Sequence, residues 1–372
     1  MRILYGVQGT GNGHITRARA MAPELARAGI AVDYLFSGRP RERLFDMEPF
    51  GDFQHRDGLT FAVREGRIDP FATLRECRPL NFIRDIRALD LDGYDLVLSD
   101  YEPITAWAAK LRKRPAVGLG HQYAFRHPIP QHRGSPGQQW LMRGFAPAST
   151  TLGLHWHHFN QPILPPIAPV ASHNLSLERG LILVYLPFES IAAIVALLGH
   201  FEGQRFLVYH PDAGEAQAPA HRQPHVEWHM PCRDGFQADL LRCEGVICNA
   251  GFELASETLQ LGKKLLVKPV AGQPEQYSNA LALDLLGYGH TMTGLDIDRV
   301  RRWLASAGGT RIRYPNVAAA ICAWLIDGAR EPIADLSARL WAATELPDIT
   351  PATRTDAALP VHPSPARLDS HG

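Results

Sequence analysis

The chain has 372 residues, 45% of them hydrophobic, and its 38 basic residues balance its 38 acidic ones. This length predicts about two domains, and the even charge balance argues against a broad nucleic-acid-binding surface. Five cysteines without a CxxC pair fit a reducing compartment better than a disulfide framework. The longest apolar run, 191–198, is far too short to cross a bilayer, and no signal peptide is expected. We therefore expect a soluble, cytoplasmic protein that binds no nucleic acid.

The first half of the chain alternates strands with helices. Strands are expected at 3–7, 31–36, 96–99, 116–119 and 151–154, with helical patterns between them, for example at 15–28 and 105–111. Such alternation predicts a parallel sheet that is covered by helices on both faces.

A proline-rich segment interrupts this pattern. Residues 160–169 contain four prolines, which can continue neither a helix nor a central strand. Strands are expected again at 181–186, 205–209, 226–229, 245–248 and 264–267. We therefore predict an N-terminal domain at 1–160, a linker at 161–174 and a C-terminal domain at 175–330, with a ligand cleft between the carboxyl ends of the two sheets.

The last part of the chain is expected to hold one more helix and a tail. Ile333, Leu336 and Leu340 share one helical face, which predicts a packed terminal helix within 331–346. Residues 347–372 are rich in proline and poor in apolar residues, so a disordered tail is predicted there.

A glycine-rich turn follows the first strand. The run Gly9-Thr10-Gly11-Asn12-Gly13-His14 leads into a helix, and its glycines allow close backbone approach and positive φ angles. A helix start suits an anion. His14 stands where a dinucleotide loop has its third glycine, and no GK[ST] follows, so neither common phosphate motif is present. Because a helix N-terminus disfavours imidazolium, His14 is expected to stay neutral and to act as a general base; capping or packing is the alternative role.

A second strand–turn–helix unit spans 245–262. Its turn, Asn249-Ala250-Gly251, would present N–H groups to a diphosphate. Glu257 in the following helix could accept hydrogen bonds from ribose hydroxyls, and a solvated helix position is its alternative reading. The later loop 269–280 is crowded with polar side chains that suit sugar hydroxyls.

The order of these motifs resembles the GT-B glycosyltransferases, in particular the branch around the peptidoglycan enzyme MurG and the plant galactolipid synthases. The loop that ends in His14 is similar to the GGTGGH element of that branch, and 250–262 with 273–280 resembles its nucleotide-sugar signature. The run 9–17, with 99–103 and 120–122, resembles more closely a little-characterised bacterial and archaeal glycosyltransferase family. The resemblance extends over roughly residues 1–330.

This resemblance implies an α/β fold with two Rossmann-like domains that face each other across a cleft. It also implies an inverting, metal-independent transfer of a sugar from a nucleoside diphosphate, most often UDP, to an acceptor hydroxyl, with His14 as the base. No cofactor is implied beyond the nucleotide-sugar substrate, since helix dipoles and side chains neutralise the leaving diphosphate. The N-terminal domain would bind the acceptor and the C-terminal domain the nucleotide sugar.

The donor-site residues implied by the resemblance come from both domains. Gly251 and its neighbours would hold the diphosphate, Glu257 the ribose, and Glu275 with Gln276 the sugar. His229 and Met230 would flank the base. The complete set is Gly11, Asn12, Gly13, Ser190, His229, Met230, Asn249, Ala250, Gly251, Phe252, Glu253, Glu257, Gln273, Glu275 and Gln276.

Two positions depart from the pattern of that branch. Where MurG-like enzymes carry a glycine-rich turn, this chain reads Leu186-Pro187-Phe188-Glu189-Ser190, in which only Ser190 is expected to donate to a phosphate. Leu254 stands where the nucleotide helix often has a threonine.

Polar residues at strand ends of the first half are expected to complete the site. Asp100 or Glu102 could orient His14 or bind the acceptor, and a plain polar strand end is the alternative. Thr16, Tyr101, His121 and Gln122 are assigned to the acceptor side.

Three runs look like metal sites but are not expected to bind metal. The histidines of 155–158 lack a carboxylate partner and helical spacing. Asp90-Leu91-Asp92 and Asp296-Ile297-Asp298 follow no apolar strand, so they are read as loop or helix-cap aspartates.

The acceptor, a small molecule or a lipid, is not specified by the sequence. An arginine-rich segment could contact an anionic membrane at its inner face, although an ordinary helix packed on the sheet is the favoured reading. Its residues are Arg64, Arg67, Arg75, Arg78, Arg84 and Arg87, with Phe61, Phe71, Leu80, Phe82 and Ile83 among them. Two other functions stay open: a UDP-sugar 2-epimerase, and a nucleotide-sugar-binding protein without catalysis.

Overall fold

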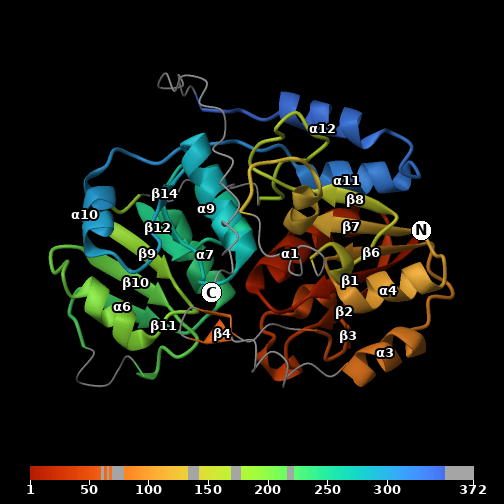
Figure 1. The fold of residues 1–372 in the computed structure, drawn as a ribbon, viewed down its shortest axis with the longest axis horizontal. Helices are drawn as coiled ribbons and strands as arrows, with labels where there is room; N and C mark the ends of the chain where they lie inside the picture. The colour runs from red at the N-terminus through yellow and green to blue at the C-terminus, as the bar shows by residue number, and fades with distance from the viewer. Residues whose placement is uncertain are drawn as a thin grey trace, which may run out of the picture.

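The computed structural model describes residues 1–59, 63–64, 67–68, 79–132, 142–168, 177–215 and 222–347. They form two six-stranded parallel sheets with helices on both faces, and the two sheets lie side by side in Figure 1. The predicted α/β fold of two Rossmann-like units is therefore confirmed. The predicted tail beyond residue 347 and the linker residues 169–174 lie outside the described residues.

The first sheet has the strand order β3-β2-β1-β6-β7-β8. Its central strands are rich in Val, Leu and Ile and buried along almost their whole length, as expected for a parallel sheet that is covered on both faces. The strands are β1 (Arg2–Gln8), β2 (Ala31–Ser37), β3 (Gln54–His55), β6 (Leu96–Asp100), β7 (Ala116–Gly120) and β8 (Thr150–Gly153). The helices are α1 (Asn12–Arg27), α3 (Pro79–Ala88) and α4 (Pro103–Leu111), and β4 (Val63–Arg64) pairs with β5 (Arg67–Ile68) in a separate hairpin.

The second sheet repeats this plan with the order β11-β10-β9-β12-β13-β14. Its strands are β9 (Leu181–Tyr185), β10 (Arg205–Tyr209), β11 (Val226–His229), β12 (Gly245–Asn249), β13 (Lys264–Lys268) and β14 (His290–Thr291). Its helices are α6 (Ile191–Leu198), α7 (Arg233–Arg242), α8 (Phe252–Gln260), α9 (Pro274–Leu286) and α10 (Ile297–Ala305). The strand order reverses between β1 and β6 in the first sheet and between β9 and β12 in the second. Open parallel sheets bind ligands at such switch points.

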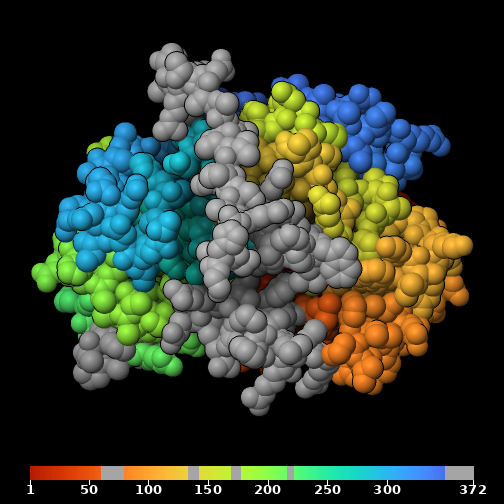
Figure 2. All heavy atoms as spheres, in the orientation of Figure 1, coloured from red at the N-terminus to blue at the C-terminus, as the bar shows by residue number. Residues whose placement is uncertain are grey.

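The chain returns to the first half at its C-terminal end. Helix α11 (Val317–Ile326) packs on α1, and Asn316 Nδ2 donates to Glu24 Oε1 at 2.9 Å. Helix α12 (Ile333–Ala342) buries Leu336 and Leu340, the residues whose spacing predicts a packed helix. Figure 2 shows both helices in blue on the side of the N-terminal half, while the green and cyan C-terminal half fills the other side.

One apolar cluster runs through both halves of the molecule. It contains residues of both sheets, such as Leu98 and Leu183, together with Trp156 and Phe252 between them. Trp156 is fully buried, and its Nε1 donates to Ser256 Oγ of α8 at 2.9 Å. The two sheets are therefore held in one arrangement by packing as well as by polar contacts.

The glycine-rich turn differs from the expectation in two ways. Helix α1 begins at Asn12, after Gly11, so His14 lies in its first turn rather than before it. None of Gly9, Gly11 and Gly13 has a positive φ angle. Space is the reason for two of these glycines, because an added Cβ would lie 2.9 Å from Ser37 O at Gly9 and 3.1 Å from Glu253 Cγ at Gly13.

Candidate functional site

The candidate site lies where the carboxyl ends of the two sheets face each other. Helices α1 and α8 pack against each other there. Asn12 Nδ2 donates to Tyr185 OH at 2.8 Å, and Gln122 Nε2 lies 3.2 Å from both carboxylate oxygens of Glu275. Residues that the sequence places far apart are thus brought together across the boundary between the halves.

His14 is held by Asp100 at the end of β6. Its Nδ1 lies 2.6 Å from Asp100 Oδ1, and the Asp100 side chain is fully buried. Burial raises the pKa of the Asp100 carboxyl, but Arg17 and His14 lower it more, so the pKa lies below its ordinary value. Arg17 Nη2 also lies 2.9 Å from Nδ1. Because an ionised carboxylate only accepts, we assign the hydrogen of a neutral His14 ring to Nδ1, which leaves the lone pair on Nε2. The nearest donor to Nε2 is Gln122 Nε2 at 3.5 Å, which is too long for a good hydrogen bond.

Arg17 connects the two halves. It is 2% exposed, its Nε donates to Asp100 Oδ2 at 2.7 Å, and its Nη2 donates to Asp100 Oδ1. Its Nη1 donates to Glu253 Oε1 from the second half. Arg17 is part of the run 9–17, but the sequence alone assigned it no role. Its position three residues after His14 places it on the same helix face.

The segment after β6 fixes the position of Asp100. Tyr101 has a φ of +52°, which turns the chain sharply, and its ring lies parallel to that of His14 with centroids 6.4 Å apart. Glu102 precedes α4 and caps it. Its two carboxylate oxygens accept from the N–H groups of Ile104 and Thr105. Of the two carboxylates expected to orient His14, Asp100 contacts it, and Glu102 is a buried helix cap.

The expected acceptor residues have different surroundings. Both ring nitrogens of His121 are used within the protein, by Leu154 O at 2.8 Å and Asn279 Oδ1 at 2.5 Å. The ring also stacks on Phe252 at 4.0 Å, so His121 joins the two halves instead of lining open space. Gln122 and Thr16 remain partly exposed beside His14.

Three helices begin at this site without a capping side chain. They are α1, α8 and α9, whose first flanking residues are Gly11, Gly251 and Gln273. An added Cβ at Gly11 or at Gly251 would meet no atom within 4 Å. Side-chain caps are present at α4, α6, α10 and α11, while α7 and α12 also begin without one. Uncapped N–H groups and the helix dipole make the three starts at this site favourable for an anion.

The turn before α8 is arranged differently from the sequence expectation. The N–H of Ala250 donates to Lys268 O at 3.1 Å, and that of Gly251 donates to Asn249 O at 2.7 Å. These two donors are therefore occupied. The donors open to an anion are those of the first turn of α8, which starts at Phe252.

Glu253 lies in that first turn and is 7% exposed. Burial raises the pKa of its carboxyl to about 8, against the lowering effect of Arg17, and Asp100, Glu257 and Glu275 raise it further. The pKa of Glu253 stays high because positive charge is scarce around it. The guanidinium of Arg17 pairs with both Asp100 and Glu253, and the carboxylates of Glu257 and Glu275 lie close by.

The other expected sugar and ribose ligands are partly used inside the protein. Glu257 is 7% exposed, and its Oε2 accepts from Gln237 Nε2 at 3.0 Å. Burial raises the pKa of the Glu257 carboxyl, opposed by Gln237 and Arg233. Gln276 is buried, and its Oε1 accepts from the N–H of Val270 at 2.9 Å, whereas Glu275 is partly exposed at the start of α9.

In the turn between β9 and α6, where this chain lacks the glycine-rich turn of MurG-like enzymes, a lysine neutralises a carboxylate. The carboxylate of Glu189 forms a buried ion pair with Lys268 Nζ from the end of β13. Ser190 caps α6, and its Oγ accepts from the N–H of Ala193 at 3.3 Å. Lys268, which sequence reasoning missed, thus neutralises a carboxylate that would otherwise repel a phosphate.

The residues expected around the nucleotide base lie at the end of β11. The ring of His229 stacks on that of Tyr209 with centroids 5.0 Å apart, and its Nε2 lies 3.2 Å from Glu227 Oε1. Met230 is 58% exposed, which is unusual for a large apolar side chain and leaves it free to contact a ligand.

The runs that look like metal sites serve local structure. The Nδ1 atoms of His155, His157 and His158 accept backbone N–H groups one or two residues ahead. Asp90 accepts from the N–H of Asp92, and Asp296 caps α10. Within the described part of the chain, no group of three His, Cys, Asp or Glu side chains is placed to hold a metal ion.

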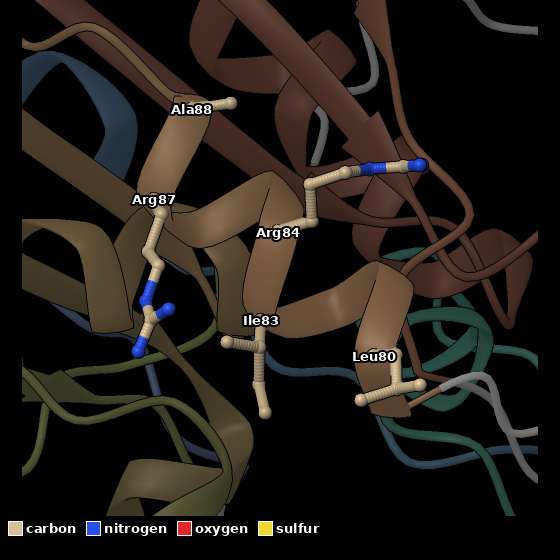
Figure 3. A pocket seen from close by; sticks show the side chains of 5 residues that line it. All are labelled: Leu80, Ile83, Arg84, Arg87 and Ala88. Atoms are coloured by element: carbon tan, nitrogen blue, oxygen red, sulfur yellow. The ribbon is translucent and has the colours of Figure 1, made fainter.

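Only part of the arginine-rich segment is described. Its residues Phe61, Phe71, Arg75 and Arg78 lie outside the described residues, as do the side chains of Arg64 and Arg67. Helix α3 packs Phe82 and Ile86 toward the first sheet and leaves Leu80 80% and Ile83 45% exposed. These two, with Arg84, Arg87 and Ala88, line a shallow hollow, and Figure 3 shows the two arginines on either side of Ile83.

No helix in the described ranges is long and apolar enough to span a membrane.

Comparison with solved structures defines the class of protein. The glycosyltransferase SnogD from Streptomyces nogalater matches with a TM-score of 0.53 and 18% identity, over 92% of this chain and 99% of that one. MurG from Acinetobacter baumannii matches with a TM-score of 0.50 and 16% identity, over 82% and 90%. The spinosyn rhamnosyltransferase SpnG in complex with thymidine diphosphate matches with a TM-score of 0.54 and 15% identity, over 91% and 97%. The fold is that of the GT-B glycosyltransferases.

The sequence comparison gives the family. The chain belongs to Glycosyl transferase family 1, whose family description matches residues 1–135 and 159–307. An uncharacterised glycosyltransferase of Methanosarcina acetivorans is 29% identical over 127 residues, which span 33% of this chain and 32% of that protein. The chain thus aligns with about a third of the length of that curated relative. The resemblance to glycosyltransferases is confirmed at the level of family and fold.

The raised pKa of Glu253 predicts a pH-dependent stability. Its pKa rises from an ordinary 4.5 to about 8 in the folded protein. The folded state therefore binds more protons than the unfolded state between these values, and the free energy of unfolding falls as pH rises from 5 to 8. We expect Glu253→Gln to flatten this slope, as measured by urea unfolding at several pH values.

Glu24→Gln is the matched control, because the pKa of Glu24 is lowered by Arg27 and Asn316 and its contribution changes only in acid. Parallel stability curves for wild type and Glu253→Gln would contradict the assignment.

Proposed function

We propose that the protein is an inverting, metal-independent glycosyltransferase that moves a sugar from a nucleoside diphosphate, UDP in the first instance, to an acceptor hydroxyl. The observation that carries the proposal is the His14–Asp100 pair in the first turn of α1, together with the uncapped starts of α8 and α9 in the second half. We assign the base to the first half and the anion site to the second, as transfer from a nucleotide sugar requires.

The proposed reaction is a single displacement. His14 Nε2 takes the proton of the acceptor hydroxyl while its oxygen attacks the anomeric carbon, and the nucleoside diphosphate leaves. Asp100 accepts the hydrogen bond from Nδ1 and stabilises the imidazolium that forms. The first turn of α8 receives the charge that develops on the diphosphate, and no metal ion is needed for this role. Attack from the face opposite the leaving group inverts the anomeric centre.

The donor is assigned to the second half and the acceptor to the first. We assign the diphosphate to the N–H groups after Gly251, the ribose to Glu257, and the sugar to Gln273 and Glu275. His229 and Met230 would flank the base. The resemblance to the MurG-like branch favours UDP, whereas SpnG is a neighbour of the same fold solved with thymidine diphosphate, so both nucleotides belong in any test.

The exposed face of α3 supports a peripheral contact with a membrane. Leu80 and Ile83 project from the protein, and Arg84 and Arg87 lie beside them to meet anionic head groups. A cytoplasmic enzyme docked in this way would find a lipid acceptor at the inner face of the membrane.

A nucleotide panel tests the donor site. UDP, GDP, dTDP, ADP and their sugars, without metal, should be compared by the thermal unfolding midpoint of wild type and Glu257→Ala. A ligand that binds the folded state raises the midpoint by mass action, and we expect one nucleotide to do so in the wild type but not in Glu257→Ala.

Glu202→Ala, at an exposed turn, serves as the control and should keep the shift. If no nucleotide raises the midpoint of the wild type, the donor-site assignment fails.

The base is tested by turnover. We expect His14→Ala to lower the release of nucleoside diphosphate by about 10²–10⁴-fold, with hydroxyl acceptors or a total lipid extract added, because general bases contribute that much. Nucleotide binding should persist, and the exposed His200→Ala should be as active as the wild type. Equal rates for His14→Ala would refute the base, and conversion of the sugar without acceptor would favour a 2-epimerase.

The membrane contact is tested by sedimentation with vesicles. We expect binding to vesicles that contain phosphatidylglycerol and a loss of at least about tenfold in Leu80→Ser/Ile83→Ser, because burial of each side chain contributes about 1.5–3 kcal/mol. Ile326→Ser, at a 54% exposed position of α11, is the matched control. Equal sedimentation of all three proteins would exclude α3 as the docking face.

A further inference from the structure

One guanidinium is shared by carboxylates from the two halves of the molecule. Arg17 contacts both oxygens of Asp100 and one oxygen of Glu253. Arginine stays protonated in proteins and only donates, so it balances one of these two negative charges. His14, on the other side of Asp100, adds a positive charge only when it is protonated.

The charged groups that face Glu253 come from every element packed around it. Arg17 belongs to α1 and Asp100 to β6, while Glu257 follows on α8 itself and Glu275 begins α9. Two of these elements belong to each half. Glu253 is therefore surrounded by three carboxylates and one cation in a place from which water is largely excluded.

The Glu253 side chain lies close against the start of α1. An added Cβ on Gly13 would lie 3.1 Å from Glu253 Cγ, so the side chain passes close against the backbone of α1. The carboxylate cannot turn away toward solvent without losing the contact with Arg17. Its charge can therefore be removed more easily by a proton than by movement.

The proposed donor diphosphate would sit against the same turn of helix. The uncapped N–H groups of α8 start at Phe252, next to Glu253, and the space in front of Gly251 is open. A diphosphate bound there brings two negative charges toward an ionised Glu253. Like charges at such short range destabilise each other strongly in a buried site.

We infer that ionised Glu253 takes up one proton from solvent when a nucleoside diphosphate binds, and returns it when the nucleotide leaves. The carboxylate becomes a neutral carboxyl, so the anion no longer meets the negative charge of Glu253 at the start of α8. Arg17 is then left with Asp100 as its only charged partner and holds that carboxylate against His14. The inference rests on the proposed donor site and adds to it a proton-linked residue that couples nucleotide binding to the base.

The pKa of Glu253 in the free protein sets the pH range in which nucleotide binding is accompanied by proton uptake. Free Glu253 has a pKa of about 8, so near pH 6 it is already protonated and binding needs no further proton. Near pH 8 about half of the free protein must gain one, so an uptake of about 0.5 proton per site is expected. Above that pH the affinity should fall by up to about tenfold per pH unit.

Titration calorimetry with UDP-glucose, dTDP-glucose and GDP-mannose tests this directly. The ionisation of these diesters stays essentially constant between pH 6 and 8. Each titration is repeated in buffers of different ionisation enthalpy, which gives the number of protons taken up. We expect wild type to take up almost none at pH 6 and about 0.5 at pH 8, Glu253→Gln none at either pH, and Glu24→Gln the same as the wild type.

Each other outcome is decisive. Uptake that persists in Glu253→Gln, or that is largest near pH 6 in the wild type, would overturn the inference while leaving the donor site in place. Binding without proton uptake would do the same. Failure of all three nucleotide sugars to bind would overturn the donor site, and the inference with it. The wild-type pH profile decides the matter even if Glu253→Gln fails to fold.

Discussion

The arrangement of the site depends on the contact of Arg17 with both halves of the molecule. This side chain is buried where two parallel sheets meet, and it is bound to Asp100 of the first half and Glu253 of the second. Removing Arg17 would leave the buried Asp100 carboxylate uncompensated, and such a loss costs about 3–5 kcal/mol. The relative position of the two halves, the orientation of His14 and the charge at the start of α8 are therefore linked through one guanidinium.

The helix ends around this contact give the cleft its chemistry. Helices α4 and α10 are capped by carboxylates, whereas α1, α8 and α9 start at the site without a capping side chain. Their partial positive charges favour an anion, and the carboxylates of Glu253, Glu257 and Glu275 oppose it. The buried pair of Glu189 with Lys268 removes one further negative charge from this region. Under the proposed function, this balance of charge would let the site bind a diphosphate and release it after transfer.

Much of the fold was predictable because hydrophobic periodicity is local. The ten expected strands match β1, β2 and β6 to β13 within one or two residues, whereas the short edge strands β3 and β14 and the β4–β5 hairpin were missed. Site residues were harder to predict. His14 and Asp100 could be proposed from their strand ends, but the choice between Asp100 and Glu102 required knowing that Glu102 caps α4. Arg17 and Lys268 gained their importance from partners 236 and 79 residues away, which no local pattern reveals.

The most direct test of the central claim is the anomeric configuration of the product. With the nucleotide sugar that binds, hydrolysis by water in the absence of an acceptor releases a free sugar, whose configuration proton NMR reads from the coupling constant before mutarotation. A single displacement assisted by His14 predicts an anomer opposite to that of the donor. Release of the sugar with its donor configuration retained would contradict the account, because it requires a second nucleophile or same-face attack that the His14–Asp100 pair does not provide.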